Sequence, residues 1–198
     1  MIPMMMVELT TVQSGILPIA ALADHLRLSR GFTDDADQDA RLESCLRAAA
    51  SAIEARTGKA LFSRRFLLTV MHWSEDGLHR LPIAPVSSIE EVRLVGRNGS
   101  ETVVDPAAYH LVEDAHRPQL TATAARLPTI SLGGSAEIEF MAGYADDWPL
   151  MPADLMQALI LLAGEFYGQN INTDAGIPFA VSVLIEPHRS VRLRGAGA

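Results

Sequence analysis

Acidic and histidine side chains are the residues of this sequence whose types and spacing could support chemistry. The aspartates at positions 34, 35, 37 and 39 have a spacing similar to that of a calcium-binding loop. The run lacks the glycine at the sixth position and the glutamate at the twelfth that such a loop needs. Acidic residues before a helix also cap its N-terminus and interact favourably with its dipole. We therefore interpret the run as the start of a helix.

The histidines offer no recognisable metal motif. Four of them, His72, His79, His110 and His116, fall in a region rich in β-forming residues. No pair has the i, i+4 helical spacing of a zinc motif such as H-E-x-x-H. We interpret them as solvated or edge-strand histidines, and we expect neither a metal nor a cofactor.

Other reactive patterns are also incomplete. The sequence has no G-x-S-x-G nucleophile elbow, and Gly133-Gly134 lacks the lysine and the serine or threonine of a phosphate-binding loop. Asp146-Asp147 is interpreted as a solvated loop. Cys45 is the only cysteine, which excludes an intrachain disulfide and predicts a small buried hydrophobe. These patterns predict no catalytic residue and favour a protein that is not an enzyme.

Composition and charge narrow the class of protein further. With 48% hydrophobic and 20% charged residues, the 198-residue chain has the composition of a folded globular protein, with one domain and an inserted subdomain. The net charge of −8 makes it a poor candidate for gripping nucleic acid, because lysine and arginine supply most of that affinity. The N-terminus lacks the pattern of a signal peptide, and Leu155–Ala163 is too short to span a membrane. We expect a protein without a membrane segment.

Helical periodicity appears at both ends of the chain. Helices are predicted from Ile19 to Leu28, from the acidic run to Arg56, from Pro152 to Gly168 and from Pro178 to Glu186. In the second of these, the apolar residues at 42, 46, 49 and 53 form one helical face, and Gly58 is the expected C-terminal cap.

The middle of the chain has β character. Alternation around Phe66–Val70 and Glu137–Phe140, and a hairpin turn at Asn98-Gly99, predict a small antiparallel subdomain. The predicted class is α+β, a bundle of about four helices with an inserted β subdomain. The expected divisions are a helical pair at 1–59, the β subdomain at 60–143, a second helical pair at 144–187 and a basic tail at 188–198.

Two regions of this arrangement indicate partners. In the third helix the apolar arc is wider than one surface helix normally needs, so the helix is either central to the core or covered by another subunit. The second alternative makes Met156, Ile160, Ala163 and Tyr167 a candidate subunit interface. Trp73 and Trp148 are either partner anchors or core residues.

Several segments, in the same order, resemble a family of tailed-phage head–tail connector (adaptor) proteins. They are Ile53–Gly58, Phe66–Val70, Leu81–Ile89, Asp105–Tyr109, Phe140–Tyr144, Met151–Leu155, and Leu184–Pro187 with Arg189 and Leu193. The β insertion between two helical pairs is similar to the adaptor of gene transfer agents, which are particles built on a phage plan. The resemblance covers about residues 7–194.

The resemblance implies a structural protein of the virion neck, made in the host cytoplasm. Its subunits would form a twelve-membered ring under the portal protein, continue the DNA channel without specific DNA binding, and dock the next tail-side protein (a stopper or connector). The C-terminal segment would reach the portal, which assigns portal binding to His188, Arg189, Arg192, Leu193 and Arg194.

Two alternatives remain at the level of sequence. One is a small metal-dependent hydrolase that uses the acidic run and the histidines, which predicts a concave pocket with convergent groups. The other is a monomeric or dimeric assembly factor that binds another protein.

Overall fold

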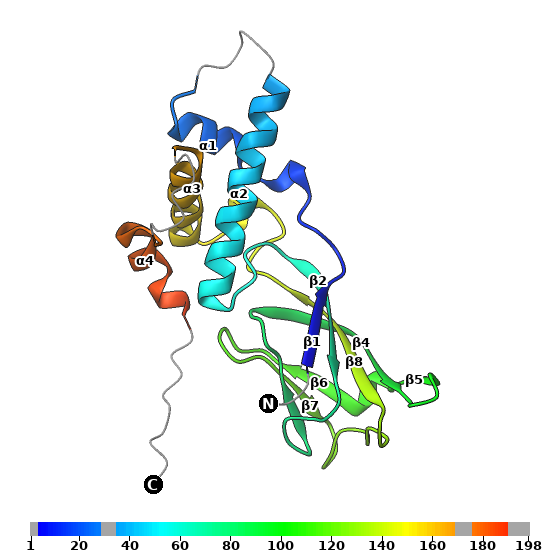
Figure 1. Ribbon diagram of the computed structural model, residues 1–198. Helices are drawn as coiled ribbons and strands as arrows, with labels where there is room; N and C mark the ends of the chain where they lie inside the picture. The colour runs from blue at the N-terminus through cyan, green and yellow to red at the C-terminus, as the bar shows by residue number, and fades with distance from the viewer. Residues whose placement is uncertain (1–3, 29–34, 169–175, 190–198) are drawn as a thin grey trace. The chain divides into compact units, whose positions relative to one another are not determined.

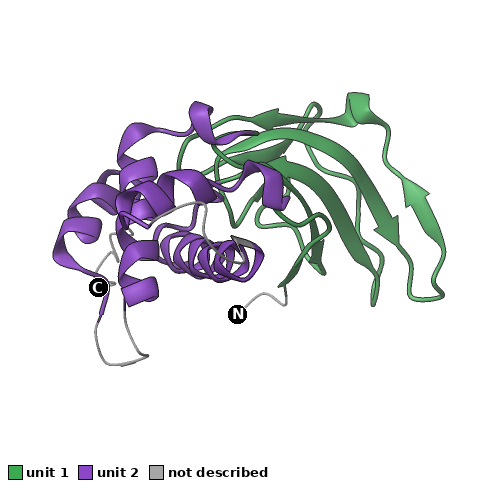
Figure 2. Ribbon diagram, turned by 90° about the horizontal axis from the view of Figure 1, so that it is seen from above, with its two compact units in different colours: residues 1–12, 62–146 green, residues 13–61, 147–198 purple. Residues whose placement is uncertain are grey.

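The computed structural model describes residues 4–28, 35–168 and 176–189 (Figure 1). Its contacts divide the chain into two compact units, coloured separately in Figure 2. Unit 1 comprises Met1–Val12 and Phe62–Asp146 and is built of strands, whereas unit 2 comprises Gln13–Leu61 and Asp147–Ala198 and is built of helices. The predicted α+β class with antiparallel sheets is confirmed.

Unit 1 contains a five-stranded and a three-stranded sheet. The strands of the larger sheet, in spatial order, are β1 (Met4–Glu8), β2 (Arg64–Val70), β8 (Ser135–Ala142), β4 (Val86–Val95) and β5 (Glu101–Val103). The smaller sheet has the order β3 (Leu78–Arg80), β7 (Gln119–Ala122) and β6 (Tyr109–Val112). All neighbouring strands in both sheets run antiparallel.

Alternation of side chains explains why the large sheet has one buried face. Buried and partly exposed residues alternate along the whole of β8, and β2 follows the same pattern. Phe66 and Phe140 stack in the core with ring centroids 5.8 Å apart. The predicted hairpin is the β4–β5 connection, in which Gly99 has the positive φ of +80° that a tight turn requires.

The first strand corrects the expected division of the chain. Residues 1–59 were predicted to form a helical pair, but Met4–Glu8 pair with Phe66–Val70 and belong to unit 1. The apolar side chains of β1 carry no alternation, because both of its faces are exposed. A period-two signal was therefore missing from the sequence.

Unit 2 contains the four predicted helices within its described residues. They are α1 (Ile19–His25), α2 (Asp35–Thr57), α3 (Ala153–Gly168) and α4 (Phe179–Ile185). Short 3₁₀ segments occur at η1 (Ser14–Ile16), η3 (Trp148–Leu150) and η4 (Glu186–His188), and a further one, η2 (Pro106–Ala108), lies in unit 1. None of the described helices is long and apolar enough to cross a membrane.

Local sequence explains the buried face and the C-terminal end of α2. The predicted face of Leu42, Leu46, Ala49 and Ile53 is fully buried. Gly58 follows the helix with φ +68°, and its N–H donates to the carbonyl of Glu54 over 2.8 Å. Glycine adopts this conformation without strain, as a C-terminal cap requires.

Helix α3 is the central helix of unit 2, since α1, α2 and α4 all pack against it. Its buried residues are Leu155, Ala158, Leu159, Ile160, Leu162 and Ala163. The wide apolar arc is thus explained by three neighbours within the same unit. Ile160 and Ala163 are 8% and 0% exposed, so their prediction as contacts for another subunit is corrected.

Candidate functional site

The acidic run lies at the start of α2 rather than around a metal. Helix α2 begins at Asp35 and includes Asp37 and Asp39 in its first turns, whereas Asp34 lies outside the described residues. Acids in this position interact favourably with the helix dipole. No group of three or more histidine, cysteine or acidic side chains within residues 4–28, 35–168 and 176–189 could hold a metal ion.

His79 is the one histidine that the structure buries among the four of the β region. It lies on edge strand β3 but is only 3% exposed. The backbone N–H of Ser74 donates to Nδ1 over 3.1 Å, so Nδ1 acts as the acceptor and the ring is neutral. Burial, with a smaller effect from Arg80, lowers the pKa of His79 to about 4.

The neighbouring Ser74 hydroxyl lies 3.2 Å from Nδ1 of His79, which raises the question of a serine nucleophile. A general base works best when its pKa is near the working pH, and a pKa of about 4 makes this histidine a weak base at neutral pH. The Ser74 hydroxyl also accepts a hydrogen bond from the N–H of Arg80. We interpret the pair as a structural bond that closes the turn between β2 and β3.

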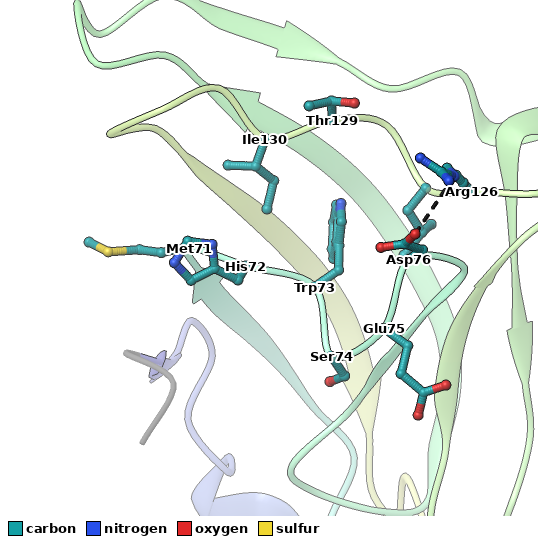
Figure 3. Close-up of a pocket in the computed structure, with 10 residues that line it drawn as sticks. Met71, His72, Trp73, Ser74, Glu75, Asp76, Arg126, Thr129 and Ile130 are labelled. Atoms are coloured by element: carbon teal, nitrogen blue, oxygen red, sulfur yellow. Dashed lines mark ion pairs between the residues drawn. The ribbon is translucent and has the colours of Figure 1, made fainter.

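A pocket of about 430 Å³ lies beside this turn in unit 1 (Figure 3). Its walls come from residues 71–76, which follow β2, and from Arg126, Leu127, Thr129 and Ile130. Arg126 and Asp76 form an ion pair at 3.7 Å, yet both side chains are highly exposed. The indole N–H of the half-buried Trp73 donates to the carbonyl of Pro128 over 2.7 Å, so this tryptophan is held by the segment between β7 and β8. The pocket lacks the shielded, convergent groups of an active site.

Two other residues singled out by the sequence are also structural. Cys45 is half-buried rather than fully buried, and burial raises the pKa of its thiol, which keeps it protonated and unreactive. Asp147 caps η3, because its carboxylate accepts the backbone N–H of Trp148 over 2.7 Å. Trp148 itself is half-buried.

Ion pairs cover the solvent-facing side of the large sheet. Arg93 contacts the carboxylates of Glu91, Glu101 and Glu137 at 3.1–3.6 Å, and Arg65 contacts Glu139 at 3.1 Å. Four acids and two bases leave this face acidic. It is unsuited to binding nucleic acid through phosphates.

The first two residues of the predicted portal-binding segment, His188 and Arg189, form polar contacts within unit 2. Nε2 of His188 lies 2.6 Å from the carboxylate of Asp154 at the start of α3, and Arg189 contacts Glu186 at 2.7 Å. Although burial alone raises the pKa of Asp154, the hydrogen bonds from His188 and from the Leu155 N–H lower it overall. Arg192, Leu193 and Arg194 lie outside the described residues.

The remaining interface candidates on α3 are partly exposed. Met156 and Tyr167 are both of intermediate exposure. The guanidinium of Arg41 lies 4.4 Å from the centroid of the Tyr167 ring and donates to its carbonyl over 3.1 Å. These two residues stay candidates for contact with another subunit.

Strand β1 is an exposed apolar surface that the sequence did not single out. Met4, Met5, Met6 and Val7 are 39–60% exposed, and Leu9 beyond the strand is 44% exposed. Apolar residues gathered on one edge in this way mark interaction sites in folded proteins. Four consecutive apolar residues near the N-terminus were the available signal, but nothing in the sequence showed that they would stay exposed.

The chain matches no protein-family model and no curated protein. It is similar to chains in three solved structures. They are the neck of an empty gene transfer agent particle computed with C6 symmetry (46% identity, TM-score 0.89), the virion of a native gene transfer agent particle (46%, 0.86) and the neck of a native particle computed with C12 symmetry (43%, 0.85). Each match covers 97% of this chain and 98% of the other.

The chain belongs to the gene transfer agent branch of the head–tail adaptor family. Identity above 40% over nearly the whole of both chains carries this assignment. The adaptor is thus a structural component of the virion neck, and the comparisons give no support to the metal-dependent hydrolase.

Proposed function

We propose that this adaptor is a ring-forming subunit that sits under the portal, extends the DNA channel and docks the next tail-side protein. The observation that carries the proposal is the full-length similarity to chains in particle necks computed with C6 and C12 symmetry. A cyclic symmetry places identical copies around an axis through heterologous contacts. The proposed ring has twelve subunits and is assembled from chains made in the host cytoplasm.

Exposed apolar side chains in each unit support self-association. In unit 1 they lie on β1, and in unit 2 they include Phe179 of α4, which is 84% exposed, and Leu150 of η3, which is 69% exposed. Met156 and Tyr167 of α3 belong to the proposed contacts between neighbouring subunits. A single copy leaves these side chains in water, whereas neighbours in a ring would cover them.

Charge supports passage of DNA without specific binding. The net charge of −8 on each subunit is repeated in every copy of a ring, and no basic stripe interrupts the acidic face of the large sheet. An acidic wall repels phosphates, so DNA would slide rather than adhere. Neither this role nor ring formation requires a catalytic residue.

We assign portal binding to the segment that begins at His188 and includes Arg189, Arg192, Leu193 and Arg194. The segment carries three arginines and no acid, and such side chains suit carboxylates or carbonyl oxygens on a partner. The His188–Asp154 contact holds its base on α3. The proposal places the portal on one side of the ring and the tail-side stopper or connector on the other.

The test is to image the full-length chain mixed with the portal of its own particle. We expect an annular layer of this chain on the portal, with cyclic symmetry. An assembly in which single copies bind at scattered sites, or as a dimer, would favour the alternative of an assembly factor.

The tail assignment has a separate test. Charge reversal at Arg192 and Arg194 together (Arg→Glu) is expected to weaken portal binding at least tenfold in a pull-down titration. The matched control is Arg126→Glu, since Arg126 is an exposed arginine of unit 1 that forms an ion pair with the exposed Asp76. Equal binding by both variants would contradict the assignment.

A further inference from the structure

The outer edge of β1 is open to another strand. The N–H of Leu9 donates to the carbonyl of Arg65 in β2 over 2.8 Å, and hydrogen-bonding direction alternates along a strand. The N–H and C=O groups of Val7 and Met5 therefore face β2, whereas those of Met6 face away from it. No strand in the described part of the chain pairs with this outer side. Proteins usually protect such an edge with charges, and Met4–Val7 contain none.

The opposite edge of the same sheet is also open. Strand β5 pairs with β4 on one side, and its other side has no partner strand among the described residues. All three residues of β5 are exposed, and Val103 is an apolar residue with 57% of its surface in water. One copy thus carries two different strand edges.

The pairing registers place the two exposed edges in line. Met5 pairs with Thr69, Thr69 with Glu137, Glu137 with Arg93, and Arg93 with Val103. Met5 and Val103 are therefore the two ends of one row of paired residues across the sheet. They lie on the same face and at the same level along the strands. Their exposed fractions are 60% and 57%. A polar, ion-paired row thus ends in an exposed apolar residue on each side.

We propose that the β1 edge of one copy docks on the β5 edge of the next copy, so that the five-stranded sheets continue from subunit to subunit. This inference rests on the proposed ring. Four successive antiparallel pairings make β1 and β5 point in the same direction, so this contact between copies is a parallel strand pair. Met5 of one subunit lies beside Val103 of its neighbour, which removes two apolar side chains from water.

The β5 edge of a second copy is a better partner for β1 than the β1 edge of that copy. Two β1 strands would form an isologous contact around a two-fold axis, which closes as a dimer and uses up the edge. Cyclic symmetry instead needs two different complementary surfaces on each copy. The β1 and β5 edges meet that requirement.

Cysteine crosslinking between copies assembled on the portal tests which residues of β1 and β5 lie side by side. In a Cys45→Ser background, Met5→Cys combined with Val103→Cys is expected to give a ladder of disulfide-linked multimers under oxidation in the presence of portal. The matched control combines Met6→Cys with Val103→Cys. Met6 pairs with the buried Leu68 and points to the other face, so at least a fivefold weaker ladder is expected.

A proline variant tests the backbone contact. Met6→Pro removes the N–H that faces outward and spares the bonds to β2, which an edge strand tolerates. We expect at least a tenfold loss of ring occupancy on the portal at an unchanged melting temperature. Leu111→Pro, on the edge strand β6 of the small sheet, is the control for proline on such an edge: the carbonyl of Ala108 accepts from the N–H of Thr123, so by the same alternation the N–H of Leu111 faces away from β7.

The outcomes separate this inference from the proposed function. Intact rings with no Met5–Val103 ladder would overturn the edge contact and leave the ring standing. Intact rings of Met6→Pro that fail to bind the tail-side protein would assign the edge to that partner and would also overturn it. Absence of rings from the unaltered chain on its portal would remove the proposed function, and this inference with it. If Met6→Pro does not fold, the crosslinking pair decides.

Discussion

Helix α3 and strand β1 are both apolar segments, one in each unit, and they end in opposite environments. Leu155 and Leu159 of α3 are fully buried, whereas Met5 of β1 is 60% exposed. Three helices of unit 2 surround α3, but among the described strands β1 has a neighbour on one side only. An apolar run is buried by its own chain only where that chain supplies enough neighbours. The exposed strand, rather than the apolar helix, is the better candidate for assembly.

The largest expected effect is a difference between the two segments in how much one substitution lowers the free energy of unfolding. Leu159→Ala should lower the free energy of unfolding by about 2–5 kcal/mol, because it leaves a cavity in the centre of unit 2. Met5→Ala should change it by less than about 0.5 kcal/mol, since the side chain is already largely in water. Urea denaturation followed by circular dichroism measures both. Equal losses of free energy would contradict the conclusion that α3 is enclosed and β1 is exposed.

The next effect concerns pH and unit 1. Folding lowers the pKa of His79 to about 4 from 6.5, so the folded chain binds this proton less readily than the unfolded chain. Stability should therefore fall as pH decreases from about 6.5 towards 4, by roughly 3 kcal/mol in total, since one pKa unit corresponds to about 1.4 kcal/mol.

His79→Gln isolates this contribution. Its stability should decline less between pH 7 and pH 4.5 than that of the unaltered chain, in paired urea titrations. His110→Gln is the control, because His110 is exposed on β6. If both variants follow the unaltered chain, burial of His79 has no effect on acid stability.

The smallest effect concerns the polar contact at the start of α3. The pKa of Asp154 is lowered, so its ion contributes stability above the ordinary value of 3.8, and this contribution is lost as pH falls below it. The carboxylate is 36% exposed, and solvent screening limits the contribution to below about 1 kcal/mol.

Asp154→Asn should therefore reduce stability slightly at pH 7 and less at pH 3, as measured by thermal denaturation. Glu186→Gln, which removes a more exposed partner of Arg189, is the control. A loss as large as that of Leu159→Ala would show that this contact, and not apolar packing around α3, dominates unit 2.

Much of the fold was predictable where one physical signal decided it. The face of α2 followed helical periodicity, Gly58 and Gly99 stood where positive φ is needed, and alternation marked the centres of β2 and β8. Short strands escaped prediction. β3 and β7 have three and four residues, too few for a period to emerge, and their pairing supplies their stability.

The candidate site was harder to predict. The width of the apolar arc on α3 had two explanations, and the position of three neighbouring helices selected the core. His79 resembled the other histidines in sequence, but pairing of β3 with β7 buries it. The interface predictions at Met156 and Tyr167, and the tail residues Arg192, Leu193 and Arg194, stay predictions.

The sequence by itself determined the local features of this adaptor: which segments are helical, where glycine and proline end them, an acidic charge that disfavours DNA binding, and the absence of a recognisable catalytic motif. These follow from the properties of neighbouring residues along the chain. The tertiary structure decided which apolar segments are enclosed and which stay exposed, and it aligned Met5 with Val103 across five strands. Burial depends on residues far apart in the sequence, which only the folded chain brings together.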